Sequence, residues 1–121
     1  MNMDLRPKTI FCDIDGTLIE HCMPSASTSL TYEIKPLPGT LEKLSEWDRN
    51  GYNIILTTGR RESMRSATEA QLAKAGIFYD QLIMGIGSGC RYIINDIKTD
   101  GTRTAYAINL ERNKGIDSIQ L

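Results

Sequence analysis

Residues 9–18 read TIFCDIDGTL, and this stretch decides the fold. A short, mostly apolar run leads into Asp13, which is typical of a buried strand that ends in an acid. Asp15 follows two residues later, and Gly16 allows the chain to turn sharply away from the strand. In an open α/β sheet the ligand crevice lies outside the carboxyl ends of the strands, so we expect both carboxylates to face it.

The rest of the chain alternates between helical and strand-like segments. One helix is expected to begin at Pro38-Gly39 and to close at Asn50-Gly51, and a second to run from about Glu62 to Ala75. Further strands are expected at 52–56, 81–84, 91–95 and 104–108. This alternation predicts an α/β fold with a mostly parallel, doubly wound sheet and right-handed crossovers.

Length and composition fit a single domain over residues 1–121. The 121 residues suffice for one compact domain and not for two, and 40% hydrophobic with 24% charged residues is an ordinary soluble composition. The formal net charge of -1 argues against broad attraction to nucleic acid or to anionic membranes. No apolar run approaches the roughly 20 residues of a membrane span. The polar N-terminus lacks the pattern of a signal peptide.

The cysteines indicate a reducing compartment. Three cysteines, Cys12, Cys22 and Cys90, form an odd set, which together with the missing signal predicts free thiols in the cytoplasm. A zinc site would need four ligands at regular spacing, but His21 is the only histidine and no Cys-x-x-Cys pair exists. We therefore expect no zinc.

The segment between the first strand and the first helix has no helical pattern. Two strand-like pieces, 17–20 and 30–35, flank the turn-rich stretch 23–28, which predicts a β-hairpin flap over about residues 17–35. The residues expected at its site-facing end are Glu20, His21 and Cys22. Because an isolated hairpin is only marginally stable in water, the flap should pack on a neighbouring subunit and the protein should be a homo-oligomer.

Polar residues follow three of the expected strands at the point where each strand ends. They are Asp13 and Asp15, Thr57 to Arg60, and Asp96 with Asp100. Because the carboxyl ends of parallel strands meet at one edge of the sheet, these segments should converge. Carboxylate oxygens suit an octahedral Mg²⁺, so the four aspartates are the expected metal ligands.

The same acids suit covalent phosphoryl transfer. With a metal to offset the repulsion between two anions, Asp13 can attack phosphorus and form an aspartyl-phosphate. Asp15 is placed to protonate the leaving oxygen and then to deprotonate the water that hydrolyses the intermediate. The Thr58 hydroxyl and a nearby cation would bind the phosphoryl oxygens, over which the transition-state charge spreads.

These segments resemble the haloacid dehalogenase (HAD) superfamily of phosphatases. Asp13-Ile-Asp-Gly-Thr-Leu18 matches the first motif of that superfamily at every position, and Thr58 before Gly59 matches the second. Asn95-Asp-Ile-Lys-Thr-Asp100 is similar to the fourth motif, in which two acids four apart follow a strand. The resemblance covers roughly residues 9–108 and implies a three-layer α/β/α sandwich with Mg²⁺ as cofactor.

The third motif, a lysine or arginine, falls where this chain has only a short glycine-rich loop. Arg91 is the best match by position, and Lys98 is the second. The expected substrate-binding residues are Gly59, Arg60 and Lys98. Three assignments keep an alternative: Thr57 as the second-motif residue, Arg60 as an exposed helix start, and Asp100 as part of an Asp-Gly turn.

The resemblance also bears on the substrate. Neither gap between the motifs has room for a typical cap domain, so the chain resembles the capless group. That group includes sugar-acid phosphatases such as the tetrameric 3-deoxy-octulosonate 8-phosphate phosphatases. We therefore expect hydrolysis of a small phosphorylated metabolite such as a sugar or sugar-acid phosphate. Neither a membrane nor nucleic acid is expected as a partner.

Two other functions stay open. Thr58-Gly-Arg-Arg-Glu-Ser63 is similar to the Ser-Gly-Arg-Glu of polynucleotide 3′-phosphatase domains, and a nucleotidase would need the same chemistry. The lack of a basic excess weighs against nucleic acid. A non-catalytic binding module could share the fold, but the intact pair of Asp13 and Asp15 argues against it.

Overall fold

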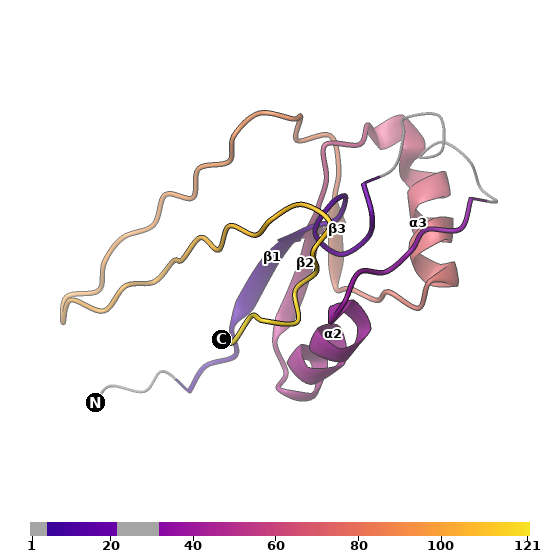
Figure 1. Ribbon diagram of the computed structural model, residues 1–121. Coiled ribbons are helices and arrows are strands. Elements are labelled where there is room, and N and C mark those ends of the chain that lie inside the picture. The colour runs from indigo at the N-terminus through magenta and orange to yellow at the C-terminus, as the bar shows by residue number, and fades with distance from the viewer. Residues whose placement is uncertain (1–4, 22–31) are drawn as a thin grey trace.

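The structure, a computed structural model, describes residues 5–21 and 32–121 (Figure 1). The centre of the expected flap, with Cys22, lies outside the described residues. The elements are β1 (Thr9–Asp13), α2 (Thr40–Arg49), β2 (Asn53–Thr57), the 3₁₀-helix η1 (Glu62–Met64), α3 (Arg65–Lys74) and β3 (Gln81–Ile83). The first three strands and both helices of the sequence prediction are therefore confirmed.

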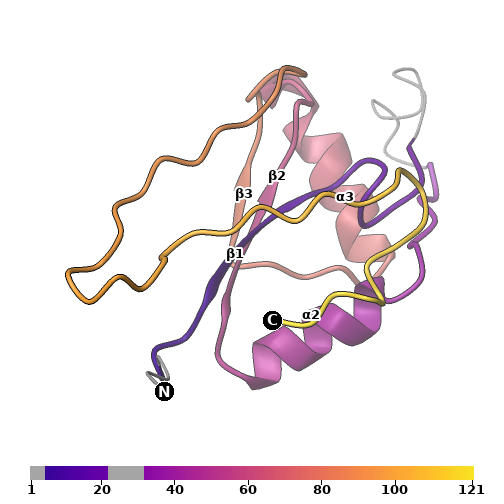
Figure 2. The same cartoon turned by 60° about the vertical axis from the view of Figure 1, so that its left-hand side comes forward.

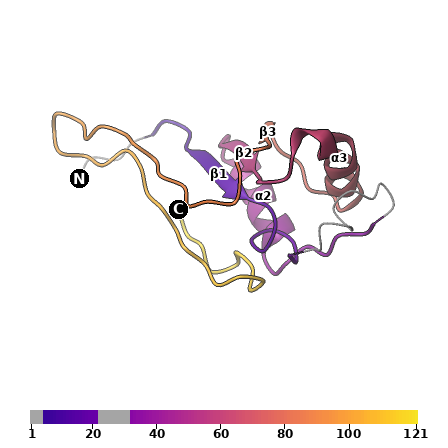
Figure 3. The same ribbon diagram turned by 90° about the horizontal axis from the view of Figure 1, so that it is seen from above.

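The strands form one parallel sheet in the order β1-β2-β3. Asp13 pairs with Thr57, and Thr57 pairs with Ile83, so the carboxyl ends of all three strands lie level. Figure 3 shows α2 and α3 on the same face of the sheet. Successive right-handed crossovers that add strands in one direction place their helices on one face, so this arrangement follows from the strand order. The predicted α/β class is confirmed.

The core lies between the sheet and the two helices. Its fully buried members are Ile14, Leu18, Ile19, Leu44, Ile54, Leu56, Leu72 and Ile116. The opposite face of the sheet carries no helix among the described residues, and Phe11 on β1 is 56% exposed there. In this part of the chain the structure therefore has two layers rather than the three that the resemblance implies.

The predicted strands at 91–95 and 104–108 are not formed. These residues belong to a long irregular segment, 88–109, which we call the arm and which extends away from the helices (Figures 1 and 2). Its two limbs meet near the tip, at an antiparallel bridge between Ile97 and Arg103 and at the Thr104 hydroxyl, which donates to the carbonyl of Asp96 at 2.6 Å. An apolar run forms a strand only where a neighbouring edge accepts its hydrogen bonds, and in this structure the arm does not lie against such an edge.

The base of the flap region is paired where the structure describes it. The N–H of Glu20 donates to the carbonyl of Lys35 at 3.0 Å, and that of Leu37 donates to the carbonyl of Leu18 at 2.8 Å. Ile19 and Pro36 form an antiparallel bridge, so the described ends of this segment run side by side as a hairpin base would.

The C-terminal segment, 112–119, packs on the start of α2. Ile116 is fully buried, and its N–H donates to the carbonyl of Pro38 at 2.9 Å. The backbone of Asp117 lies so near Gly39 that an added Cβ would meet it at 2.5 Å.

No helix among the described residues is both long and apolar enough to cross a membrane.

Candidate active site

The loop after β1 displays two carboxylates and buries the residues between and beyond them. Ile14 and Leu18 are fully buried, while Asp13 and Asp15 keep partial contact with solvent. The N–H of Leu18 donates to the carbonyl of Ile14 at 2.9 Å, and Gly16 takes a left-handed conformation with φ 86°. The alternation of acid and apolar residue thus fixes both carboxylates at the carboxyl edge of the sheet.

Asp13 lies at the end of β1 in a half-buried position. The Thr17 hydroxyl donates to its Oδ2 at 3.3 Å. Burial raises the pKa of Asp13, the positive charge of Arg91 partly lowers it again, and the negative charge of Asp15 raises it further. Partial desolvation with few hydrogen bonds leaves a carboxylate poorly satisfied, and such a group is a better nucleophile than a fully hydrated one.

Asp15 is locked by a forked ion pair. Nε and Nη2 of Arg60 donate to its two carboxylate oxygens at 3.0 and 2.8 Å. Nη1 of Arg60 donates to the Thr68 hydroxyl at 3.1 Å and to Oε1 of Gln71 at 2.9 Å, both on α3. Because the two α3 side chains hold the planar guanidinium in place, the guanidinium in turn fixes the orientation of the Asp15 carboxylate.

This geometry corrects the expectation that Arg60 contacts substrate. Arg60 is only 8% exposed, and its guanidinium faces Asp15 and α3 rather than a crevice. Thr68 and Gln71 were missed by the sequence analysis, which gave this helix its bounds but assigned no role to its polar residues. Their signal is a pair of polar residues three apart on the buried side of a helix, where polar groups need partners.

The second-motif segment forms a tight turn after β2. Thr57 is the last residue of β2, opposite Asp13, and Thr58 is the first residue beyond it. The hydroxyl of Thr58 accepts the N–H of Arg60 at 3.1 Å, so its own proton remains available to donate. Gly59 lies against the carbonyl of Gly87, where an added Cβ would stand 2.6 Å from the oxygen. The roles of Thr58 and Gly59 in binding phosphate stay predictions.

Arg91, the first choice for the third-motif cation, lies close to the second-motif turn, and its role stays a prediction. Its Nη1 donates to the carbonyl of Gly89 at 2.8 Å and its Nη2 to the carbonyl of Gly87 at 2.9 Å. The same Gly87 carbonyl touches Gly59, so the guanidinium is held beside the second-motif turn. Its charge acts on the pKa of Asp13 across the site. The lower-ranked candidate Lys98 lies beyond it in the arm, next to Asp100.

The structure does not bring the two later aspartates to the first two. Among residues 5–21 and 32–121, no three histidine, cysteine or acidic side chains gather in a group that could hold a metal ion. Asp96 and Asp100 sit in the arm, and the expected convergence fails because 91–95 forms no strand beside β1. The predicted cluster of four acids is therefore absent from the described part of one chain.

Asp100 behaves as its alternative interpretation predicted. Its carboxylate accepts the N–H of Thr102 at 2.9 Å, and hydrogen bonds to Thr102 lower its pKa. Gly101 follows with φ 88°, as a turn after Asp requires. The structure thus gives Asp100 a turn-forming role at the tip of the arm.

The donors that remain suit a magnesium ion in part. Mg²⁺ in phosphoryl-transfer sites commonly takes one or two carboxylates and completes its shell with water and substrate phosphate. Asp13 offers a hard carboxylate at the sheet edge, whereas both oxygens of Asp15 are engaged by Arg60. Asp13 could therefore ligate Mg²⁺ in one chain, whereas a second carboxylate, where the site uses one, would have to come from elsewhere.

Two C-terminal residues lie beside the first-motif loop. The N–H of Asn113 donates to the carbonyl of Gly16 at 2.8 Å, and its Oδ1 accepts the N–H of His21 at 2.9 Å. The side chain of Arg112 packs on Gly16, 3.0 Å from where a Cβ would stand. Sequence reasoning assigned nothing to this segment; its only local signal is the turn-forming pair of Asn113 and Gly115.

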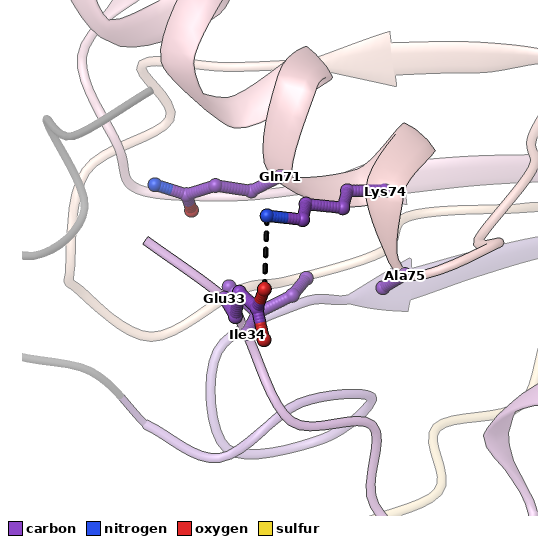
Figure 4. A pocket seen from close by; sticks show the side chains of 5 residues that line it. All are labelled: Glu33, Ile34, Gln71, Lys74 and Ala75. Atoms are coloured by element: carbon purple, nitrogen blue, oxygen red, sulfur yellow. Dashed lines mark ion pairs between the residues drawn. The ribbon is translucent and has the colours of Figure 1, made fainter. Parts of the chain in front are cut away.

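A pocket of about 230 Å³ lies apart from these groups, at the C-terminal half of α3 (Figure 4). Its lining residues are Glu33, Ile34, Gln71, Lys74 and Ala75. Nζ of Lys74 and Oε1 of Glu33 form an ion pair across it at 2.9 Å. Gln71 is shared between this pocket and the Arg60 network, but none of the predicted site residues lines the pocket.

Comparison with known families gives one match. Residues 29–94, more than half of the chain, match the family described as HAD superfamily, subfamily IIIB (Acid phosphatase). No curated protein matches the chain.

Similar chains occur among solved structures, and three of them bear on the fold. One, from the structure of a Pnkp1/Rnl/Hen1 complex, is 35% identical with a TM-score of 0.57, and the match covers 71% of this chain and 30% of that chain. One from a Pnkp1/Rnl/Hen1 RNA repair complex is 33% identical with a TM-score of 0.54, over 78% and 28% of the two chains. A target protein from Vibrio cholerae, 20% identical over 88% and 84% with a TM-score of 0.51, shares the fold. The chain therefore spans less than a third of either complex chain that it matches.

Proposed function

Because the chain belongs to the HAD superfamily, subfamily IIIB (Acid phosphatase), we propose that it is a phosphomonoester hydrolase whose nucleophile is Asp13. The observation that carries the proposal is the pairing of two acids in unlike environments. Asp13 is half-buried and only lightly hydrogen-bonded, whereas Asp15 is held by both arms of the Arg60 fork. One carboxylate is thus prepared to attack, and the other is fixed in place to move a proton.

The reaction runs in two balanced steps. A carboxylate oxygen of Asp13 forms a bond to phosphorus while the ester P–O bond breaks, and the carboxyl of Asp15 gives its proton to the leaving alcohol oxygen. Water then attacks phosphorus, Asp15 takes a proton from that water, and the acyl-phosphate P–O bond breaks. Inorganic phosphate leaves, and Asp13 returns as a carboxylate. A Mg²⁺ ion bound at Asp13 would neutralise charge between the carboxylate and the phosphoryl group.

The phosphoryl oxygens meet donors from the second and third motifs. The Thr58 hydroxyl has a proton to donate, and the close packing of Gly59 on Gly87 keeps side chains out of the turn. The Arg91 guanidinium adds a fixed positive charge beside Asp13. Preorganised donors of this kind stabilise the charge that spreads over the equatorial oxygens in the transition state.

We propose a small phosphorylated metabolite as substrate, such as a sugar or sugar-acid phosphate. The formal net charge of -1 gives the chain no overall basic excess with which to attract a nucleic-acid backbone. Free Cys12 and Cys90 among the described residues support a reducing, cytoplasmic setting.

A polynucleotide 3′-phosphatase is the second candidate, because a specific observation favours it. Two similar solved chains come from a Pnkp1/Rnl/Hen1 complex and from one described as an RNA repair complex, at 35% and 33% identity. A 3′-phosphate at an RNA end is chemically another phosphomonoester, so the same Asp13 mechanism would act on it.

The test is phosphate release from a matched panel. Sugar phosphates, sugar-acid phosphates, nucleotides and 3′-phosphorylated oligoribonucleotides are each assayed with Mg²⁺ and with EDTA, using Asp13→Asn as the blank. Turnover of the sugar compounds above the oligonucleotides supports the leading substrate, and the reverse order supports end repair. No phosphate release from any member with Mg²⁺ present would contradict the phosphatase assignment itself.

A further inference from the structure

The arm presents apolar side chains with nothing covering them. Ile94 is 92% exposed, Tyr92 is 86% exposed and Tyr106 is 75% exposed, and Ile93, Ile97 and Ile108 are each more than half exposed. Contiguous exposed apolar residues of this kind mark an interaction site on a soluble protein. We therefore expect a partner to cover the apolar side chains of the arm.

The backbone of the first limb, residues 88–95, is also not paired with any other described backbone segment. Within the described part of the chain, no N–H or C=O group of residues 88–95 takes part in a backbone–backbone hydrogen bond. Unpaired backbone groups in an extended apolar segment are the template to which a sheet edge pairs. The covering partner should therefore be a strand edge rather than a helix face.

The same molecule exposes such an edge on β1. The strand is bonded to β2 on one side only, because it is the outer member of the three-strand sheet. Every second residue of an edge strand directs its N–H and C=O away from the sheet. On the uncovered face beside this edge, Phe11 is 56% exposed, so an apolar neighbour would be well placed to cover it.

The register of residues 91–96 against β1 decides whether the arm on this edge comes from the same chain or from a second copy. A strand parallel to β1 that ends with Asp96 next to Asp13 must begin with Arg91 five residues earlier, roughly 16 Å back toward the amino end of β1. The structure holds Arg91 at the opposite end, beside the second-motif turn, by its bond to Gly87. One chain therefore cannot keep Arg91 at its site and also bring its own Asp96 there.

We propose that the protein is a strand-exchanged homodimer, in which residues 91–96 of each chain pair with the β1 edge of the other. Exchange of an identical element between two copies satisfies both unpaired edges and covers both arms. The Gly85 to Gly89 loop serves as the hinge, since Gly85 and Gly87 both adopt positive φ. Each site then combines Asp13, Asp15 and Arg91 of one chain with Asp96 of the partner subunit.

This arrangement supplies the carboxylate that the site of one chain lacks. It rests on the proposed function for the role of Asp96, but the pairing itself is independent of activity. The second acid of the fourth motif, Asp100, keeps its turn at the tip of the arm in the dimer.

The pairing is tested first by oligomeric state with proline variants. A strand cannot accept proline where its N–H bonds to a neighbouring strand, and of two adjacent N–H groups of the added strand one must face β1. Light scattering should therefore report a dimer for the wild type and a monomer for Ile93→Pro, Ile94→Pro or both. Thr99→Pro is the matched control, because Thr99 is the second residue of the arm's tip turn, where proline is favoured. A monomeric wild type, or a dimer that survives both variants, overturns the exchange.

The shared site is tested by complementation. Asp13→Asn and Asp96→Asn chains are each assayed alone and after joint refolding from denaturant. In an exchanged dimer the mixed species has one site with both aspartates intact, so the mixture should regain roughly a quarter of wild-type activity. A mixture as inactive as its parents, or an Asp96→Asn variant as active as wild type, overturns the shared site. If the wild type itself is inactive, the proposed function fails while the light-scattering result still decides the exchange.

Discussion

Asp13 is held in surroundings that oppose its charge. Burial and the neighbouring Asp15 raise its pKa above the ordinary value of 3.8, and Arg91 offsets only part of that rise. A folded-state pKa above the unfolded one means that the charged carboxylate destabilises the fold. This penalty is absent below the unfolded pKa and appears as the pH rises through the folded pKa. Functional groups often carry such a stability penalty.

Replacing this charge should therefore stabilise the protein while abolishing its chemistry. We predict that Asp13→Asn increases the free energy of unfolding at neutral pH in EDTA, and that the gain disappears as the pH falls toward 3.8. Urea denaturation across the pH range measures it. Asp48→Asn, an exposed acid of α2, gives the background change. A destabilised Asp13→Asn at neutral pH would show that the environment favours the charged form.

Arg60 should be needed for stability as well as for turnover. Arg60→Met removes the guanidinium that pairs with both carboxylate oxygens of Asp15. Breaking a buried ion pair costs about 3 kcal/mol at the lower end of the usual range, and the lower end applies because the Asp15 side chain is 20% exposed. Arg61→Met, an exposed neighbour in the same turn, is the control and should change little. Equal urea midpoints and equal kcat for the two variants would contradict the positioning role of Arg60.

The acids of the first motif were predictable because everything that defines them is local. A strand that ends in an acid, followed by a second acid and a glycine, lies within eight consecutive residues. The fork of Arg60 was not predictable, because its partners Asp15 and Gln71 are 45 and 11 residues away. Only the docking of α3 on the sheet brings these three side chains together.

At the scale of elements, the C-terminal segment stabilises the start of α2. The backbone of Asp117 lies against Gly39, whose φ is 86°, whereas Gly51 at the other end of α2 has φ 73° and open space around it. Alanine at either position has a similar left-handed penalty, of about 1 kcal/mol. Only Gly39→Ala also forces a steric clash with another segment.

We therefore predict that Gly39→Ala lowers the free energy of unfolding by about 1–3 kcal/mol more than Gly51→Ala does. Thermal and urea denaturation of the two variants measure the difference directly. Indistinguishable variants would show that the 112–119 segment does not dock at Gly39 in solution.

The sequence predicted β1, β2, β3 and both helices because each has its own periodicity and a glycine or asparagine to end it. The prediction was wrong for 91–95 and 104–108, where apolar, β-branched residues favour a strand but no edge of the same chain receives them. Strand formation depends on a partner that local sequence does not specify. The packing of 112–119 was missed for the same reason, since its contacts are made with residues near 16 and 38.

At the scale of the whole molecule, the reactivity of Cys12 reports global unfolding, and Cys90 serves as the exposed reference. Cys12 is 7% exposed on β1, and burial raises the pKa of its thiol to about 12, whereas Cys90 is exposed. We predict that iodoacetamide modifies Cys90 quickly and Cys12 only at the rate of global unfolding, because the thiolate is the reactive form. Peptide mass spectrometry on a Cys22→Ser background separates the two sites. Equal labelling rates in native buffer would mean that β1 opens locally.

The central claim is that Asp13 carries the phosphoryl group during turnover, and trapping that group tests it most directly. The wild-type protein is mixed with Mg²⁺ and its best substrate, quenched in acid and reduced with borohydride, which converts an acyl-phosphate of aspartate to homoserine. Peptide mass spectrometry should then find homoserine at position 13 and unchanged aspartate at position 15. Steady release of phosphate with unmodified Asp13, or with the modification at another acid, would contradict the account.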